Sequence, residues 1–119
     1  MSIAVIVAYS KDNVDKTTIG LTLAGAALQK GEPVSVILMS EGVRLAVKGY
    51  ADDMDNGDPF KPVQILIQEL FSGGAEVYVC TPCVKQRKID EREIIPMVTA
   101  IGGADVIRIL KSRDRTIQL

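Results

Sequence analysis

Continuous apolar segments that alternate with helical segments constrain the fold of this chain most. Ile3 to Ala8 and Val34 to Met39 are predominantly apolar and rich in β-branched residues. Such segments are typical of strands in a parallel sheet, which are buried on both faces. Between them, Lys16 to Lys30 is predicted to be a helix, because it ends at Gly31, a residue type favoured after a helix end. Two strands joined by one helix predict a right-handed βαβ unit.

The rest of the chain continues this alternation. We expect further helices over Val43–Tyr50, Pro62–Phe71 and Ala104–Lys111, an acidic mobile loop over Ala51–Pro59, and strands over Val77–Val79 and Thr116–Leu119. Ile94 to Ile101 fits a helix or a strand, and Pro96 with the β-branched residues after it favours a short strand from about Met97. Five strands with helices between them predict a three-layer α/β/α domain with a mostly parallel five-stranded sheet.

Composition narrows the functional classes. The 119 residues suggest one domain, residues 1–119, and the net charge of −1 argues against nucleic-acid binding. The chain has no histidine, which excludes mechanisms built on a Ser/His or Cys/His pair. No apolar run is long enough to span a bilayer, and the N-terminus lacks the charged region of a signal peptide. Two cysteines are too few for a disulfide-stapled secreted domain, so we expect a cytoplasmic protein.

The two cysteines form a C-x-x-C motif directly after the third buried strand. Thr81 followed by Pro82 predicts a helix start, which places Cys80 at the carboxyl end of the strand and Cys83 in the first helical turn. Ligands of open α/β sheets collect at that end of the strands. The helix dipole and the nearby Lys85, Arg87 and Lys88 are expected to favour thiolate, the reactive form of cysteine.

Other interpretations of the motif remain open. The thiols could pack as small hydrophobic side chains in a strand and a turn. They could exchange disulfides, although the segment before the motif does not follow the thioredoxin pattern. A zinc site needs two more ligands, which only Asp or Glu could supply here, so we expect no metal and no cofactor.

Several segments together resemble one known family. They are the opening strand with its small-residue helix, Glu41 to Asp52, Gly73-Gly74 before Val77 to Cys83, and Gly102-Gly103-Ala104. In this order and spacing the chain is similar to the DsrE/DsrF-like family, which includes TusD-type sulfur-relay subunits. The resemblance covers nearly the whole chain and implies a five-stranded α/β/α domain that assembles into trimers or hexamers.

The resemblance also implies a role for the first cysteine. In members that carry sulfur, a cysteine at the end of this strand accepts a persulfide sulfur from one protein and passes it to another, and Cys80 matches it. Many members have Arg-Gly a few residues later, and here Arg87 matches while Lys88 stands in place of the glycine. If that position has a positive φ, the lysine introduces about 1 kcal/mol of strain.

The leading hypothesis is therefore a sulfur carrier, or sulfurtransferase-like protein, without conventional small-molecule turnover. Cys80 would hold the persulfide, and Lys85, Arg87 and the helix N-terminus would stabilise the anion. Cys83 could displace sulfide from that persulfide and leave a disulfide, or it could protect Cys80. Partners would be sulfur donor and acceptor proteins, a TusA-like carrier among the candidates, with homo-oligomers expected and neither nucleic acid nor membrane.

Two further hypotheses come from other classes. A thiol–disulfide redox protein would use Cys80 and Cys83 as a pair and need both for activity. A non-catalytic ligand-binding or structural oligomer would instead use a pocket formed by three loops that carry Tyr9-Ser10, Ser40-Glu41-Gly42 and Cys80.

Overall fold

The computed structural model describes residues 1–119. The strands are β1 (Ile3–Val7), β2 (Val34–Leu38), β3 (Glu76–Cys80), β4 (Thr99–Ile101) and β5 (Arg115–Gln118). The α-helices are α1 (Val14–Gln29), α2 (Val63–Ser72), α3 (Thr81–Gln86) and α4 (Gly103–Ser112). Four 3₁₀ segments complete the chain: η1 (Lys11–Asn13), η2 (Ser40–Ala46), η3 (Tyr50–Asp53) and η4 (Glu91–Glu93).

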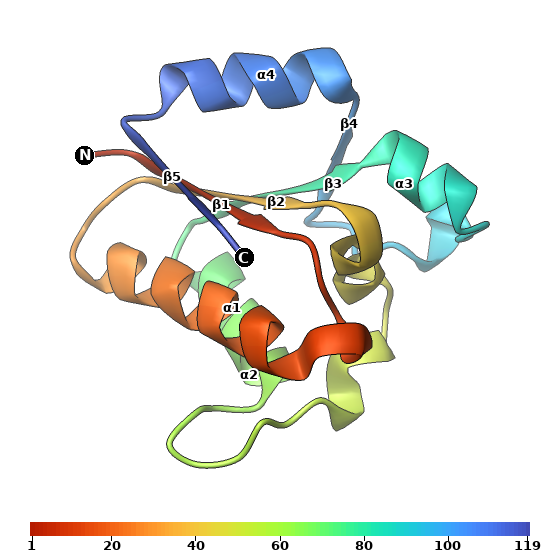
Figure 1. The fold of residues 1–119 in the computed structure, drawn as a ribbon, viewed down its shortest axis with the longest axis horizontal. Helices are drawn as coiled ribbons and strands as arrows, with labels where there is room; N and C mark the ends of the chain where they lie inside the picture. The colour runs from red at the N-terminus through yellow and green to blue at the C-terminus, as the bar shows by residue number, and fades with distance from the viewer.

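All five strands pair in parallel, in the order β4-β3-β2-β1-β5. Helices α1 and α2 cover one face of the sheet and α4 covers the other (Figure 1). The predicted three-layer α/β/α architecture is therefore confirmed. Short α3 lies beside the sheet, beyond the end of β3.

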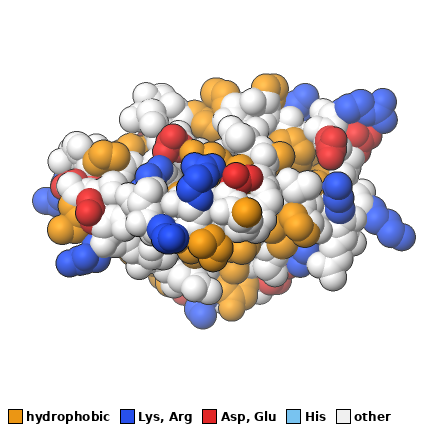
Figure 2. Space-filling model, turned by 90° about the horizontal axis from the view of Figure 1, so that it is seen from above, with side chains coloured by type: hydrophobic (Ala, Val, Ile, Leu, Met, Phe, Trp, Pro, Cys, Tyr) orange, Lys and Arg blue, Asp and Glu red, His pale blue; other side chains and the backbone are white.

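The alternation of side chains along each strand divides the core in two. Val5, Val7 and Val36 belong to a cluster of 20 buried residues that includes side chains of α1 and α2. Ile6 and Ile37 point to the opposite face, where they join a cluster of 5 buried residues with side chains of β4 and α4. The outer surface mixes hydrophobic, basic and acidic side chains, and the view in Figure 2 shows no extended field of one charge sign.

Three predicted elements need correction. The helix expected over Val43–Tyr50 is wrong: η2 ends at Ala46, and Val47 forms an antiparallel bridge with Ile94. Gly49 then adopts a left-handed φ of 79°, which ends any helical continuity before η3. The first helix begins at Val14 rather than Lys16, because the side chain of Asn13 caps it by accepting a hydrogen bond from the Lys16 N–H.

The fourth strand is of the predicted type but shorter. It begins at Thr99 instead of about Met97, and the backbone N–H of Val98 closes a turn onto Ile95. None of the four α-helices is long and apolar enough to cross a membrane.

Candidate functional site

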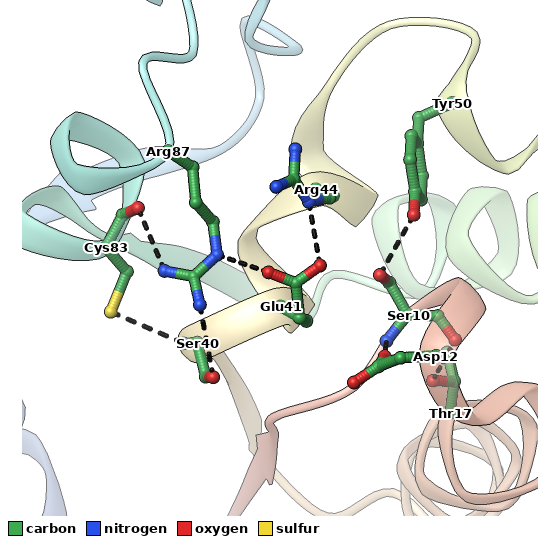
Figure 3. A network of polar contacts seen from close by, with 9 residues as sticks. All are labelled: Ser10, Asp12, Thr17, Ser40, Glu41, Arg44, Tyr50, Cys83 and Arg87. Atoms are coloured by element: carbon green, nitrogen blue, oxygen red, sulfur yellow. Dashed lines mark hydrogen bonds and ion pairs between the residues drawn. The ribbon is translucent and has the colours of Figure 1, made fainter.

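The candidate site forms where two neighbouring strands end. Leu38 of β2 pairs with Val79 of β3, so the two chain segments leave the sheet side by side. One continues into η2 at Ser40 and the other into α3. The backbone N–H of Ser40 donates a hydrogen bond to Cys83 Sγ at 3.3 Å, although the residues are 43 positions apart (Figure 3). Parallel pairing thus assembles a site from distant parts of the sequence.

Cys80 lies at the junction of β3 and α3. It is the N-cap residue of α3, so the predicted helix start is displaced by one residue, with Thr81 and Pro82 inside the first turn. Its side chain is 7% exposed and belongs to the larger core cluster. Cys83 is the third residue of the helix and is partly exposed, and both cysteines are free.

The surroundings of Cys80 do not favour its thiolate overall. Burial raises the pKa of the Cys80 thiol, because desolvation disfavours the charged form, and the neighbouring Cys83 thiol raises it further. The backbone N–H of Cys83 and the charge of Arg87 act in the opposite direction but do not outweigh burial. The expectation that the helix start and the basic residues would make Cys80 a ready thiolate is therefore wrong.

Arg87 connects α3 to η2. Its Nε donates to Glu41 Oε2 at 2.5 Å, its Nη1 to the carbonyl of Cys83 at 3.2 Å, and its Nη2 to Ser40 Oγ at 3.4 Å (Figure 3). The side chain is only 17% exposed. A guanidinium can hold several acceptors in one plane, so Arg87 fixes the position of η2 relative to Cys83.

Glu41 accepts hydrogen bonds from two arginines. Besides Arg87, the Nε of Arg44 donates to its other oxygen at 2.8 Å. Hydrogen bonds from Arg87 and Arg44 hold the pKa of Glu41 below its ordinary value. The group of one carboxylate and two guanidinium groups carries one net positive charge, and Arg87 is its member on the side of Cys83 (Figure 3).

Gly42 has a packing role. A Cβ built at this position would lie 2.0 Å from the carbonyl oxygen of Val7, closer than any real side chain approaches backbone. The residue is buried where η2 crosses the end of β1. Gly42 therefore lets η2 lie against β1, and no side chain of its own contributes to a pocket.

The other predicted basic residues differ in role. Lys85 is exposed and forms no ion pair, and Lys88 is exposed as well. The backbone at Lys88 has a φ of 55°, so the positive φ inferred from the missing glycine is confirmed. Arg87 alone among these residues reaches the cysteine motif.

Tyr9 and Ser10 form a separate group at the end of β1. Ser10 is fully buried, and its hydroxyl shares a hydrogen bond of 3.0 Å with that of Tyr50. The Lys16 ammonium lies 5.3 Å from the centre of the Tyr9 ring, and that of Lys11 lies 4.5 Å from the Tyr50 ring. No hydrogen bond joins this group to Cys83, Arg87 or Glu41. The three loops expected to form one pocket therefore carry two separate groups of polar contacts.

A hollow lies on the other side of α3. It has a volume of about 280 Å³ and is lined mainly by apolar residues, among them Val84, Ile94 and Val98, with Thr81 and Glu91 as polar members. No three His, Cys, Asp or Glu side chains lie close enough together to hold a metal ion.

This arrangement can be compared with known proteins. The model of the DsrE/DsrF-like family matches residues 1–119. The chain belongs to the DsrE/DsrF-like family. A relative from Methanopyrus kandleri, the uncharacterized protein MK0008, is 30% identical over 115 residues, covering 97% of this chain and 91% of the relative.

Two further comparisons concern a second relative and a solved structure. The uncharacterized protein MJ0989 of Methanocaldococcus jannaschii is 26% identical over 117 residues and covers 98% of both chains. The crystal structure of the ychN protein from E. coli superposes with a TM-score of 0.71 at 19% identity, covering 100% of each chain. This second likeness supports the fold of the family.

Two features of the site were missed in the sequence, Arg44 and the donor role of the Ser40 backbone, although Ser40 itself was expected to line a pocket. Arg44 carried a signal, since it follows Glu41 by three residues, the spacing of neighbours on a helical turn. The contact of the Ser40 amide with Cys83 had no signal in the sequence. Ser40 has a φ of 52°, a backbone conformation that a glycine in the sequence would predict and a serine does not.

Proposed function

We propose that this DsrE/DsrF-like protein is a sulfur carrier that holds a persulfide on Cys80 and transfers it to a partner protein. The main observation in support is the paired thiols at the carboxyl end of β3, one buried in the core and one in contact with a backbone N–H from the neighbouring loop. Family membership favours sulfur relay over unrelated thiol chemistry.

The transfer needs no cofactor or external oxidant. A cysteine thiolate attacks the outer sulfur of a donor persulfide, R–S–SH, and the donor leaves as R–S⁻. The sulfur is then held as Cys80–S–SH until an acceptor thiolate attacks the same outer sulfur, which restores Cys80–S⁻. One S–S bond breaks and one forms in each step, so no net oxidation takes place.

The partners of this reaction are thiol proteins. A donor that carries a persulfide and an acceptor with a free thiol, such as a TusA-like carrier, fit the chemistry. The family also suggests assembly into homo-oligomers, which equilibrium sedimentation would test.

Peptide mapping after brief exposure to inorganic polysulfide tests the proposal. The wild-type protein should gain one sulfur atom, retained on the Cys80 peptide after desalting and removed by dithiothreitol. After a brief glutathione wash that leaves the wild-type persulfide in place, Cys80→Ser should hold little sulfur, whereas Cys80→Ser protein that retains as much sulfur as wild type after the wash would refute the proposal.

A redox pair is the second candidate. It is favoured by the placement of two free thiols within one helical turn, where the Cys83 side chain influences Cys80 directly. It predicts that polysulfide removes two hydrogens from the protein, linking Cys80 to Cys83 with no sulfur retained.

A further inference from the structure

The two thiols of the motif differ in access. Cys80 is 7% exposed among core residues such as Val79 and Val84, while Cys83 is partly exposed at the surface end of the site. A donor persulfide carried by another protein must bring its sulfur within bonding distance of the attacking thiolate. Cys83 is the thiol that such a donor reaches first.

The two thiols also differ in their polar contacts. The Ser40 N–H points at Cys83 Sγ from 3.3 Å, and a hydrogen bond from an amide stabilises negative charge on sulfur. Arg87 holds both sides of this contact, because it donates to the Cys83 carbonyl and to the Ser40 hydroxyl. Cys80 has no donor from η2, and although the N–H of Cys83 acts on it, burial outweighs that contribution and raises the pKa of its thiol.

The N-cap position brings the thiols together. Cys80 is the N-cap residue of α3 and Cys83 is its third residue, and the Cys83 thiol lies near enough to raise the pKa of Cys80. A sulfur atom on Cys83 is therefore within reach of Cys80 when the side chains rotate.

Building on the function proposed above, we infer that Cys83 is the entry thiol, which receives sulfur from the donor, and that Cys80 is the storage thiol, which receives it from Cys83. In the first step the Cys83 thiolate attacks the outer sulfur of the donor, R–S–SH, whose S–S bond breaks as R–S⁻ leaves. In the second step Cys80 attacks the outer sulfur of Cys83–S–SH, and the bond between that sulfur and Cys83 breaks. The proton released by Cys80 is transferred to Cys83, so the second step only exchanges a sulfur atom and a proton between two residues.

The Ser40 amide serves both steps. It stabilises Cys83 as the attacking thiolate in the first and as the leaving thiolate in the second. Burial then protects the sulfur held on Cys80 from thiols in solution, because an attacking thiol must enter the core to reach it.

A time course on wild-type protein tests the order of the steps. Serum albumin carrying a persulfide serves as a protein-sized donor, inorganic polysulfide as a small one, and samples are trapped by alkylation and mapped by mass spectrometry. Both cysteines lie on one peptide, so fragment ions locate the sulfur; with the albumin donor, it should appear on Cys83 first and on Cys80 later. Simultaneous appearance, or appearance on Cys80 first, would overturn the inference.

Single variants test the two roles separately. Cys83→Ser should load Cys80 from albumin persulfide about tenfold more slowly or worse, with a smaller loss for polysulfide. Cys80→Ser should accept sulfur on Cys83 at the wild-type rate but lose it to glutathione about tenfold faster than wild type loses its own. The double variant Cys80→Ser/Cys83→Ser gives the background.

The outcomes separate this inference from the function on which it rests. Wild-type protein that takes up no sulfur from either donor refutes the sulfur-carrier function and the inference together. Wild-type loading on Cys80 that is unaffected by Cys83→Ser leaves the carrier function intact and refutes the entry role. A Cys80–Cys83 disulfide as the only product refutes both and favours the redox pair.

Discussion

At the scale of single residues, backbone conformation shapes the candidate site as much as side-chain chemistry does. Ser40 and Lys88 both have positive φ without being glycine, at 52° and 55°. The first directs an amide at Cys83, and the second lies directly after Arg87 at the end of α3. A left-handed conformation costs about 1 kcal/mol or more for a residue with a Cβ, so these positions are strained.

The strain at Lys88 predicts a stabilising substitution. Lys88→Gly should raise the free energy of unfolding by about 1 kcal/mol, because glycine adopts a positive φ without steric cost. Urea denaturation followed by circular dichroism measures the change. Lys88→Ala removes the same exposed charge but keeps the Cβ, so it should show no such gain, and equal stabilities of the two variants would contradict the explanation.

The charge of Glu41 predicts how stability depends on pH. Arg87 and Arg44 lower the pKa of Glu41 in the folded chain below its ordinary value of 4.5. Its stabilising contribution is therefore fully present above that value and is lost as the pH falls through the lower, folded pKa. Glu41→Gln should be less stable than wild type at neutral pH, with the difference shrinking as the pH falls below 4.5.

Denaturation curves at several pH values measure this difference. Glu91→Gln is a matched control, since Glu91 is exposed and forms no ion pair. A gap between Glu41→Gln and wild type that stays constant from neutral pH to well below the folded pKa would show that charge pairing is not its cause.

At the scale of elements, the sequence predicts those strands and helix ends that depend on a local pattern of residues. The apolar segments around Val5, Val36 and Val77 identified the three central strands, and Gly31 marked the end of the first helix. The region after β2 was mispredicted because its hydrophobic spacing is helical while Gly49 and the bridge from Val47 to Ile94 interrupt it. That bridge depends on tertiary contact, which no local pattern records.

The candidate site likewise has parts that the sequence predicts and parts that depend on tertiary contacts. Cys80 and Arg87 could be selected from the motif and the family resemblance. The contact of Ser40 with Cys83 could not, because it requires β2 beside β3 and a left-handed serine. Burial of Cys80, which reverses its expected pKa shift, likewise follows from packing of the complete domain.

The packing of η2 on β1 predicts a destabilising substitution. Gly42→Ala should lower the free energy of unfolding by about 1–3 kcal/mol or more, since its Cβ meets the carbonyl of Val7 and the backbone must shift. Thermal and urea denaturation measure the loss.

A second glycine supplies the control. Gly25 lies within α1 and a Cβ there would contact nothing within 4 Å, so Gly25→Ala should stabilise the protein by about 0.5–1 kcal/mol. Opposite signs for the two substitutions are expected, and equal effects would show that space at Gly42 is not limiting.

At the scale of the whole molecule, the two thiols differ in how far the fold must open before a reagent reaches them. Cys80 belongs to the central core cluster, whereas Cys83 lies at its margin. Cys80 is the last residue of β3 and the N-cap of α3, so access to it requires a local opening at the start of α3, which has a lower free energy than global unfolding. Helix α3 lies beyond the sheet rather than over its centre (Figure 1), and Cys83 on this helix is partly exposed in the native fold.

Pulsed alkylation across a urea series tests this difference. Cys83 should react rapidly with iodoacetamide in the native protein, and Cys80 should react more slowly, through a local opening that precedes the global unfolding transition. The extent of labelling at each cysteine is measured from the fragment ions of the peptide that holds both. Equal labelling rates of the two cysteines without urea would contradict the burial of Cys80.

The contact between Ser40 and Cys83 has a consequence for how such proteins diverge. The donor is a backbone amide, so its chemistry is independent of which side chain is attached. Glycine or asparagine, which tolerate a positive φ, would present the same N–H at position 40. The residue at this position can therefore change during evolution while the hydrogen bond is kept. A search for conserved residues in an alignment would not find it.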